Sequence, residues 1–420
     1  MPIGPIQLLK QATPAQRRTL LAAALGWMLD AFDAMLYALV LAYVMRDLGM
    51  SKRTAGFLYT LTLLASGIGG LLFGFLADRI GRKRALMLSI LTYSICSFAS
   101  GLSTTVLMLA AFRFILGLGM GGEWNTGATL VAETWPDDLR AKAIALVQSS
   151  WAIGYALAAL VAGIVLRYAN WRFVFFVGIL PALVTLWMRR QVPESQLWID
   201  RQPKPSLART LAPASRDDSF FAIFRAPYVK STIILLLLNF FGLFAWWGLF
   251  TWIPPYLSLP LAQGGRGFSA MRTATLLIVL NLFGMFPGYI SFGWVADYLG
   301  RRKAFVVYLF AAALLVPLYA TARSQVVLLL AGTVLAFFGT GFFSGSGLIG
   351  SEIFPTALRA RALGFTYNGA RALSCIAPWI IGWAGQTKGL SSAFYLCGAA
   401  FLFASLMATQ LPETKGKALE

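Results

Sequence analysis

The sequence contains no histidine, only three cysteines and few charged residues. Charged residues make up 12% of its 420 positions, against roughly a quarter in soluble domains. Without histidine the chain lacks the commonest metal ligand and proton shuttle, so carboxylates must carry any proton chemistry. Cys96, Cys375 and Cys397 lie in apolar runs without paired spacing, which argues against a disulfide framework or a zinc site. No nucleophile–base set or nucleotide loop is evident, so an enzyme is not expected.

Apolar residues are abundant instead. They make up 58% of the chain, and the mean hydropathy is +0.71. Too few polar residues remain to cover a water-soluble fold of this size, so we expect an integral membrane protein. The net charge of +19 would suit a nucleic-acid binder. However, the basic residues form short clusters between long apolar runs, a pattern that reports membrane topology rather than phosphate binding.

Apolar runs that can cross a bilayer as a helix, which takes about 20 residues, recur along the whole chain. The first run follows Arg18, contains Asp30 and Asp33, and is longer than a signal-peptide core. We therefore interpret it as a membrane helix rather than a cleaved signal. The predicted spans are 19–45, 55–77, 85–103, 105–133, 142–166, 172–188, 230–257, 272–296, 304–322, 325–353, 362–385 and 391–410.

One long polar stretch, Arg189 to Lys230, divides these spans into two sets of six. We predict a six-helix bundle over 1–190, a cytoplasmic linker over 191–229 and a second bundle over 230–420. Lysines and arginines concentrate in the loops on the side of both termini. The positive-inside rule places that side in the cytoplasm. We expect a bacterial-type inner membrane or a plasma membrane.

Three short motifs recur in the two halves at a single offset of 219 residues. The segments are 74–82 with 293–301, 133–136 with 352–355, and 193–195 with 412–414. An even number of spans per half makes the halves parallel, and transporters of this kind bind substrate between them near the midplane. We therefore predict an all-α membrane protein. Its twelve transmembrane helices form two six-helix halves related by a pseudo-twofold axis along the membrane normal.

The repeated loop Gly-x-x-x-Asp-x-x-Gly-Arg-Lys/Arg after spans 2 and 8 resembles the signature loop of the major facilitator superfamily. The Pro-Glu-Ser and Pro-Glu-Thr motifs after spans 6 and 12 resemble its sugar-porter branch. The glycine-rich run from Arg113 to Glu123, with Asp30 and Asp33 in span 1, is more similar to the sialate, aromatic-acid and other metabolite:proton symporters. Span 5 lacks the Gly-Pro pair of drug:proton antiporters, which disfavours that activity.

Four charged residues in the first half are candidates for proton coupling: Asp30, Asp33, Arg113 and Glu123. Asp30 and Asp33 share a helix face, and two acids so close in a low dielectric do not both ionise easily. Arg113 is the natural partner, and the resemblance implies that Asp33 and Arg113 match the proton-coupling pair of sugar symporters. A permanent salt bridge is the alternative. Glu123 is either a second proton carrier or a buried, hydrogen-bonded acid.

Substrate contacts are predicted in both halves. Arg371 in span 11 presents a planar fork that suits a carboxylate, with pairing to Glu123 as the alternative. Gln148 follows Arg140 by eight residues, the spacing at which sugar porters place a substrate-binding glutamine. An amide in a membrane helix more often joins helices than binds a ligand. Further candidates are Asn239, Asn281, Asn368, Tyr37 and Tyr155.

The charged loop residues are predicted to act as gates rather than substrate contacts. A carboxylate at a span end can pair with the positive N-terminus of a neighbouring helix. The resemblance implies that such contacts lock one access state and break in the other. For Glu133, an ion pair or cap near Arg140 is the structural interpretation. The predicted gating residues are Asp78, Arg82, Glu133 and Arg140, with their counterparts Asp297, Arg301, Glu352 and Arg359.

These patterns predict proton-driven symport of a small organic anion, a carboxylate or sugar acid, by alternating access. Symport or facilitated uptake of a neutral sugar or polyol is the alternative, favoured by Gln148 and the Pro-Glu motifs, whereas Arg371 and Glu123 favour an anion. A transport-inactive nutrient sensor is a third interpretation, although such proteins usually carry a long cytoplasmic extension. We expect a monomer in lipid that binds a small molecule and protons, without cofactor, metal or nucleic acid.

Overall fold

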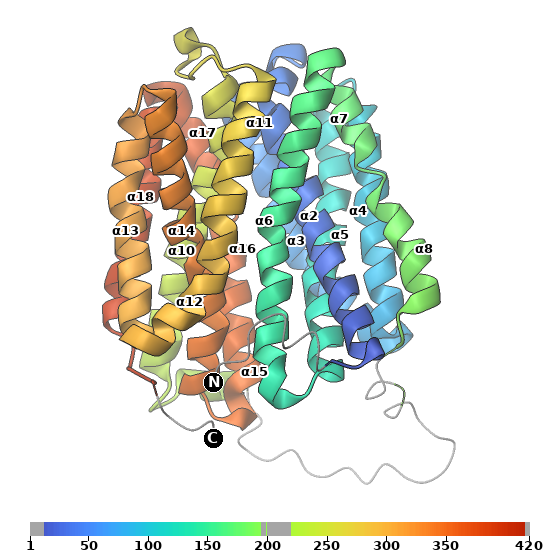
Figure 1. The fold of residues 1–420 in the computed structure, drawn as a ribbon, viewed down its shortest axis with the longest axis vertical. Coiled ribbons are helices and arrows are strands. Elements are labelled where there is room, and N and C mark those ends of the chain that lie inside the picture. The colour runs from blue at the N-terminus through green and yellow to red at the C-terminus, as the bar shows by residue number, and fades with distance from the viewer. Residues whose placement is uncertain (1–11, 195–198, 200–219, 416–420) are drawn as a thin grey trace.

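The computed structural model describes residues 12–194, 199 and 220–415, and every regular element in this part is a helix. Figure 1 shows long helices running nearly parallel, with the blue-to-green helices beside the yellow-to-red ones. Most of the predicted linker, 191–229, lies outside the described residues. The prediction of an all-α fold with two sets of long helices is confirmed.

The first half contains six rods, the last of which is interrupted. Its helices are α2 (Pro14–Asp47), α3 (Lys52–Ile80), α4 (Arg82–Gly101), α5 (Val106–Thr134), α6 (Asp137–Tyr168), and α7 (Trp171–Val177) with α8 (Pro181–Gln191). Within this half α3 and α4 pack on α5, and α2 packs on α6. Each rod corresponds to one predicted span.

The second half follows a short 3-10 helix, η2 (Phe220–Phe224), and repeats the same order. Its elements are α10 (Val229–Ser258), η3 (Leu261–Gln263), α11 (Ala270–Val279), η4 (Leu280–Met285), α12 (Phe286–Leu299), α13 (Arg301–Thr321), α14 (Gln325–Ile353), α15 (Thr356–Leu363), η5 (Gly364–Gly369), α16 (Ala370–Ser374), α17 (Ala377–Lys388) and α18 (Leu390–Thr409). Here α18 packs on α13 and α10.

Two rods of the second half contain a π-helical turn, whereas their sequence counterparts in the first half do not. The eighth rod runs through α11, η4 and α12, and its counterpart is the continuous helix α3. The eleventh rod runs from α15 through η5 to α17, and its counterpart is the continuous helix α6. A π-turn inserts one extra residue per turn and is a common origin of helix kinks. The two halves are therefore alike in order but not in helix regularity.

Ten segments among the described residues are long and apolar enough to cross a membrane. The rods that fall short are α4 and the interrupted rod over 356–388. In α4 the apolar run is broken by buried serines, among them Ser89, Ser94, Ser97 and Ser100. Serine hydroxyls are tolerated inside membrane bundles because they bond to neighbouring helices. Ser89, for example, donates to the carbonyl of Gly119 at 2.6 Å.

Each of the repeated loops contains a glycine whose φ angle is positive, a conformation that favours glycine over other residues. Gly81 has a φ of 102° and Gly300 a φ of 98°, and these two residues occupy equivalent places in the repeat. A side chain at either position would be strained, because L-residues rarely adopt such angles. This turn reverses the chain between α3 and α4, and again between α12 and α13.

Glycines in α5 allow close helix packing. A methyl group added to Gly119 would lie 2.8 Å from the backbone nitrogen of Tyr93. One added to Gly121 would overlap the carbonyl of Ser66. Backbones that approach this closely bring α5 against both α3 and α4.

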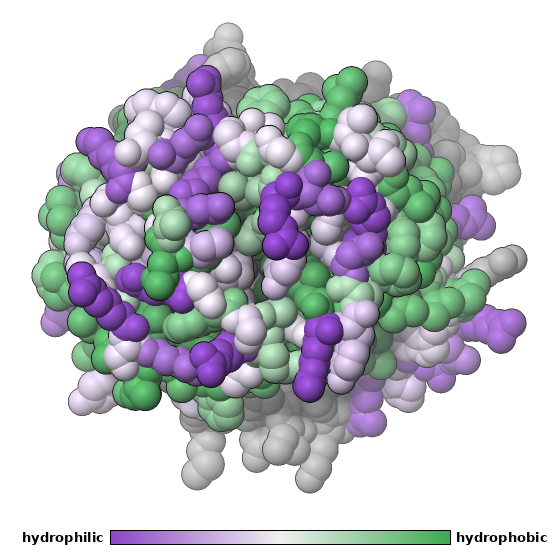
Figure 2. Space-filling model, turned by 90° about the horizontal axis from the view of Figure 1, so that it is seen from above, coloured by the Kyte–Doolittle hydropathy of each residue, from purple (hydrophilic) through white to green (hydrophobic). Residues whose placement is uncertain are grey.

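The two halves meet along two seams at the end where α2 ends and α11 begins, at the top of Figure 1. In the first seam, α3 packs on α17. A methyl group on Gly382 would lie 2.5 Å from the carbonyl oxygen of Lys52. The Lys52 ammonium donates to the carbonyls of Gln263, at 2.7 Å, and Gly385, at 3.3 Å. Figure 2, which looks onto this end, shows hydrophilic residues across the face and hydrophobic ones around much of the rim.

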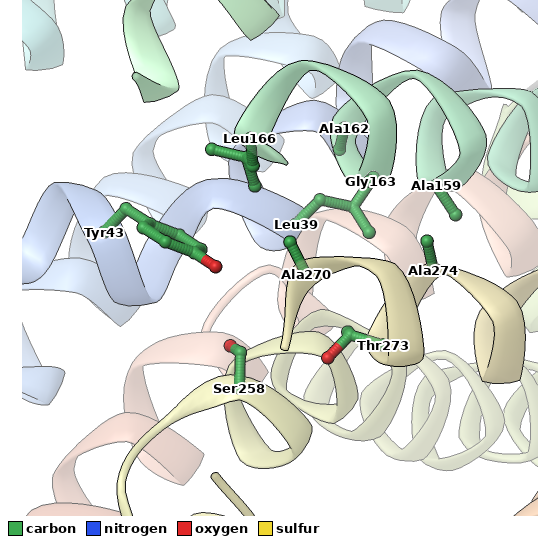
Figure 3. A pocket seen from close by; sticks show the side chains of 10 residues that line it. All are labelled: Leu39, Tyr43, Ala159, Ala162, Gly163, Leu166, Ser258, Ala270, Thr273 and Ala274. Atoms are coloured by element: carbon green, nitrogen blue, oxygen red, sulfur yellow. The ribbon is translucent and has the colours of Figure 1, made fainter. Parts of the chain in front are cut away.

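In the second seam, α6 packs on α11. A methyl group on Gly163 would lie 2.5 Å from the Cβ of Ala274. Figure 3 shows the small cavity left here, lined by Ala162 and Gly163 of α6, Ala270, Thr273 and Ala274 of α11, and side chains of α2 and α10. Its volume of about 10 Å³ is at the lower limit for one water molecule. The halves are therefore closed against each other at this end.

Candidate functional site

Asp33 lies inside the first half rather than between the halves. Its side chain is fully buried, and Oδ1 accepts a hydrogen bond from the Ser97 hydroxyl at 2.8 Å. A methyl group on Gly178, which follows α7, would lie 2.6 Å from the same oxygen. Oδ2 has no hydrogen-bond partner. Asp33 thus occupies a tight space between α2, α4 and α7, away from lipid.

Arg113 of α5 is also fully buried, and none of its three guanidinium nitrogens has a hydrogen-bond partner. The guanidinium instead lies over the ring of Tyr37, 4.8 Å from its centroid, and 5.9 Å from that of Phe175. Cation–π contacts of this kind partly replace lost hydration. Arg113 and Asp33 interact electrostatically but form no hydrogen bond. The direct contact expected for this pair is therefore not made in the state that the structure shows.

Asp30, Glu123, Ser66 and Arg371 form a second group, here called the acid–arginine cluster. Asp30 and Glu123 are almost completely buried, and both oxygens of Asp30 and Oε2 of Glu123 have no hydrogen-bond partner. The two acids interact electrostatically with each other, and Asp30 also interacts electrostatically with Arg371. Arg371 donates from Nη2 to the Ser66 hydroxyl at 2.8 Å. This bond joins α16 to α3 and so crosses between the halves.

A group of aromatic rings lies beside this cluster and also spans both halves. Trp27 of α2 and Trp151 of α6 have ring centroids 4.8 Å apart. Trp151 lies 6.0 Å from both Trp246 and Trp247 of α10, and Trp247 lies 6.0 Å from Tyr59 of α3. The indole nitrogens of Trp151 and Trp246 are buried and have no hydrogen-bond partner. The rings thus form an apolar surface in which the indole N–H groups of Trp151 and Trp246 remain available as hydrogen-bond donors.

Gln148 lies on α6 one helical turn before Trp151. It is buried, and its Oε1 has no hydrogen-bond partner. Tyr155, one turn further along α6, donates to the carbonyl of Phe250 on α10 at 3.1 Å, a bond between the two halves. Gln148 therefore offers a free acceptor beside the tryptophans, whereas the Tyr155 hydroxyl is already used between helices.

The other predicted substrate residues differ in what their polar atoms do. Asn239 donates to the carbonyl of Thr366 at 3.3 Å and accepts from the Ser346 hydroxyl at 2.7 Å. Its amide therefore joins three helices of the second half. Asn281 donates to its own helix, at the Leu277 carbonyl, and its Oδ1 has no hydrogen-bond partner. Asn368, in η5, is exposed.

Tyr37 combines two contacts within the first half. Its hydroxyl donates to the carbonyl of Ala55 at 3.2 Å, while its ring lies under Arg113. It therefore holds Arg113 in place rather than facing the space between the halves.

The gating residues form the same network twice, at the end of the molecule opposite the seams. In the first half Arg82 pairs with Asp78 at 2.5 Å and with Glu133 at 3.2 Å. In the second half Arg301 pairs with Asp297 and, at 2.9 Å, with Glu352. Both networks lie within one half each. Arg140 is half-buried near the start of α6, and Arg359 donates to the carbonyl of Phe354 at 3.4 Å.

The Pro-Glu motifs supply a capping acid to each network. Glu194 accepts from the backbone nitrogen of Lys83 at 3.1 Å. Glu413 accepts from the backbone nitrogen of Arg301 at 2.8 Å. The carboxylates thus cap α4 and α13, where the helix dipole favours negative charge. Burial raises the pKa of Glu413, but four backbone N–H donors lower it more, so that the net pKa lies below its ordinary value.

Sequence reasoning missed the hydroxyl groups that organise the site. Ser66 and Ser97 occupy ordinary small-residue positions in the spans and carry no charge that would single them out. Trp27 and Trp151 carried a usable signal, because each lies one helical turn from a predicted site residue, Asp30 or Gln148. Rings that repeat at this spacing share a helix face with the polar group.

A bundle of two similar helical halves, with buried charges between and within them, defines a membrane transport protein. The Major Facilitator Superfamily model matches residues 23–291 and 266–419, and the chain belongs to this superfamily. It is therefore an integral membrane protein and a transporter, not an enzyme.

Several relatives are similar over nearly the whole chain. The sialic acid transporter NanX of Escherichia coli is 34% identical over 403 residues, covering 93% of each chain. The cis,cis-muconate transport protein of Acinetobacter baylyi is 31% identical over 388 residues, covering 92% of each. The crystal structure of a D-xylose-proton symporter aligns with a TM-score of 0.77 at 21% identity, covering 96% of this chain and 100% of that one. That likeness establishes the fold.

Proposed function

We propose that this protein is a proton-coupled symporter of small organic acids that works by alternating access. The observation that supports the proposal most directly is the bond from Arg371 to Ser66, which places a cation of the second half beside two buried acids of the first. Two relatives are named for organic acids, sialic acid and cis,cis-muconate. We further propose a monomer in a bacterial inner membrane, with both termini in the cytoplasm.

The proton carrier is the pair Asp30 and Glu123. Two neighbouring acids in a low dielectric do not both stay ionised. Both oxygens of Asp30 and Oε2 of Glu123 lack a hydrogen-bond partner, so the pair takes up and releases a proton as its surroundings change. Arg371 changes these surroundings, because its distance from Asp30 depends on the relative position of the two halves. Asp33 and Arg113 are both enclosed in the first half. They contribute to the electrostatic potential around the acid pair, and they do not exchange partners between the halves.

The substrate carboxylate binds Arg371. In the closed state the guanidinium is held by a neutral hydroxyl, Ser66, a weaker partner than a carboxylate. Protonation of the acid pair removes the negative charge that competes with the substrate for Arg371. The incoming carboxylate then replaces the Ser66 hydroxyl as the partner of Arg371. Proton and substrate thus favour the same state, which is the condition for coupling. The free acceptor of Gln148 and the indole donors of Trp151 and Trp246 are available to the rest of the substrate.

The test of proton coupling is uptake into proteoliposomes of muconate, sialic acid and xylose, with and without an imposed pH gradient. Asp30→Asn is expected to abolish accumulation against a gradient while sparing substrate exchange, because the acid pair then loses one site. Asp47→Asn, on the same helix but bound to Arg172 at 2.7 Å, is the matched control. An Asp30→Asn protein that still concentrates substrate would refute the role of this pair.

The choice between an acid and a neutral sugar is tested at Arg371. A charge-assisted hydrogen bond contributes about 1.5–3 kcal/mol, so Arg371→Gln is expected to weaken binding of an acid by roughly 10- to 150-fold. A sugar carrier would lose much less. Arg323→Gln, an exposed arginine elsewhere, is the control. Unchanged acid affinity in Arg371→Gln would contradict the proposed anion site.

A further inference from the structure

A groove of about 730 Å³ opens on the outside of the first seam, between α3 and α17. Arg53 and Phe57 line it from α3, and Trp379 and Gln386 line it from α17, with Ile376 just before that helix. Its volume is within the range of ligand pockets, about 300–1,000 Å³. The groove is separate from the acid–arginine cluster and takes no part in the transport scheme above. We infer that it binds one phospholipid, with the phosphate at Arg53 and an acyl chain along Phe57 and Ile376.

The depth of the groove in the membrane follows from helix length. The 29 residues of α3 span about 44 Å at 1.5 Å per residue. They therefore extend about 7 Å beyond a ~30 Å hydrocarbon layer at either end. Arg53 lies in the first turn, at headgroup level, and Phe57 lies one turn deeper. On α17 the order matches, because Gln386 is near the end of the helix and Ile376 precedes its start.

The polarity of the groove changes along the same axis. Its shallow end presents the exposed Arg53 and Gln386. Its deep end presents Phe57, with 50% of its surface exposed, and Ile376, with 37%. Trp379 lies between, with the Arg53 guanidinium 5.7 Å from its ring centroid, and tryptophan is typical of the membrane interface. A polar head above an apolar surface matches an amphiphile rather than a soluble ion.

No acidic side chain at this end of the described structure pairs with the positive charge of Arg53. At the helix ends and in the loops on this side, the sequence contains one acid, Asp47, the last residue of α2. Asp47 is already bound to Arg172 at 2.7 Å. Among the residues that the structure describes, no ion pair is formed by the Arg53 guanidinium. A phosphate group from the surrounding bilayer supplies the missing negative charge, and arginine pairs well with phosphate.

A lipid bound here would touch both halves. The backbone nitrogen of Arg53 already donates to Oε1 of Gln386 at 3.2 Å across the seam. A phosphate on the guanidinium and a chain against Trp379 and Ile376 would add to this contact, so that the lipid favours the closed seam.

The test is native mass spectrometry of the purified full chain with 1-palmitoyl-2-oleoyl phosphatidylglycerol. Arg53→Gln is expected to lose one tightly held lipid, with at least tenfold weaker retention. Arg323→Gln removes an equal charge at the same end, outside the groove, and should behave as the wild type. Equal retention in Arg53→Gln and the wild type would overturn the assignment.

Two further arms separate the lipid from other anions. Thr60→Trp fills the deep end of the groove and keeps Arg53, so it should also lose the lipid. Dihexanoyl phosphatidylglycerol, with the same head and short chains, should bind much more weakly than the long-chain lipid. If inorganic phosphate or muconate displaces the long-chain lipid at equal concentration, or if Thr60→Trp retains it, the site is a soluble-anion site and the inference is wrong.

Discussion

The fit of Gly56 against α17 allows a quantitative prediction about opening of the seam. A methyl group at this position would overlap the carbonyl oxygen of Pro378 and lie 2.9 Å from its carbonyl carbon. Both are backbone atoms, which cannot rotate away. Gly56→Ala is therefore expected to disfavour the closed state, while the open state, in which α3 and α17 separate, accommodates the methyl group.

The magnitude follows from overpacking. Inserting a methyl group into a closely packed contact costs about 1–3 kcal/mol. Alanine also favours the helix by up to about 1 kcal/mol over glycine, but it does so in both states, and this term cancels. The ratio of open to closed molecules should therefore rise about 5- to 150-fold.

The assay uses a thiol buried in the second seam. Ala162 is 3% exposed and lines the small cavity in Figure 3. After replacement of the three native cysteines, Ala162→Cys should react with a membrane-impermeant maleimide only when the halves separate at this end. Adding Gly56→Ala should raise the labelling rate in proportion to the open population.

The matched control is Gly74→Ala on the same helix, where an added methyl group meets nothing within 4 Å. It should leave the labelling rate unchanged. Equal rates in Gly56→Ala and Gly74→Ala would show that close packing at Gly56 does not hold the seam shut, and the reasoning from the seam would fail.

Three smaller predictions concern the loops and helix ends. Gly300→Ala, at a φ of 98° and a ψ of 156°, should lower the melting temperature by a few degrees, because backbone strain of about 1–3 kcal/mol adds to a clash of the new methyl group with Glu413 Oε2, 2.5 Å away; an unchanged melting temperature would exclude both costs. The pKa of Glu413 is below its ordinary value of 4.5, so its stabilising effect is present above about pH 4.5 and is lost as the pH falls further. Melting curves against pH should lose this component in Glu413→Gln. Asp47→Asn should cost at most about 1 kcal/mol, measured by thermal unfolding, because the pair with Arg172 is partly exposed.

The fold was largely predictable because its signals are local. A run of apolar residues defines a membrane helix wherever it occurs, since only a helix satisfies its own backbone in lipid. The 219-residue repeat then indicated two similar halves, and the structure places Asp78 and Asp297 in equivalent ion pairs. The glycines at 81 and 300 likewise carry the same turn in each half.

The site was less predictable because it depends on how each helix is rotated against its neighbours. Asp30 and Asp33 share a face in sequence terms, yet Asp33 meets Ser97 inside the first half while Asp30 lies toward Arg371 and Glu123. A rotation of a few tens of degrees decides such partners, and it is set by close contacts between helices that are distant in sequence. Neutral partners such as Ser97 leave no trace in composition or charge.

The π-turns in the second half make the two repeats mechanically unequal. At each seam an unbroken helix of the first half, α3 or α6, faces a rod of the second half that contains η5 or η4. When the seams part, we expect bending to concentrate at η4 and η5, where the backbone hydrogen bonds are already irregular. We therefore expect the first half, with its enclosed charges, to move as a rigid body, and the second half to bend at its π-turns.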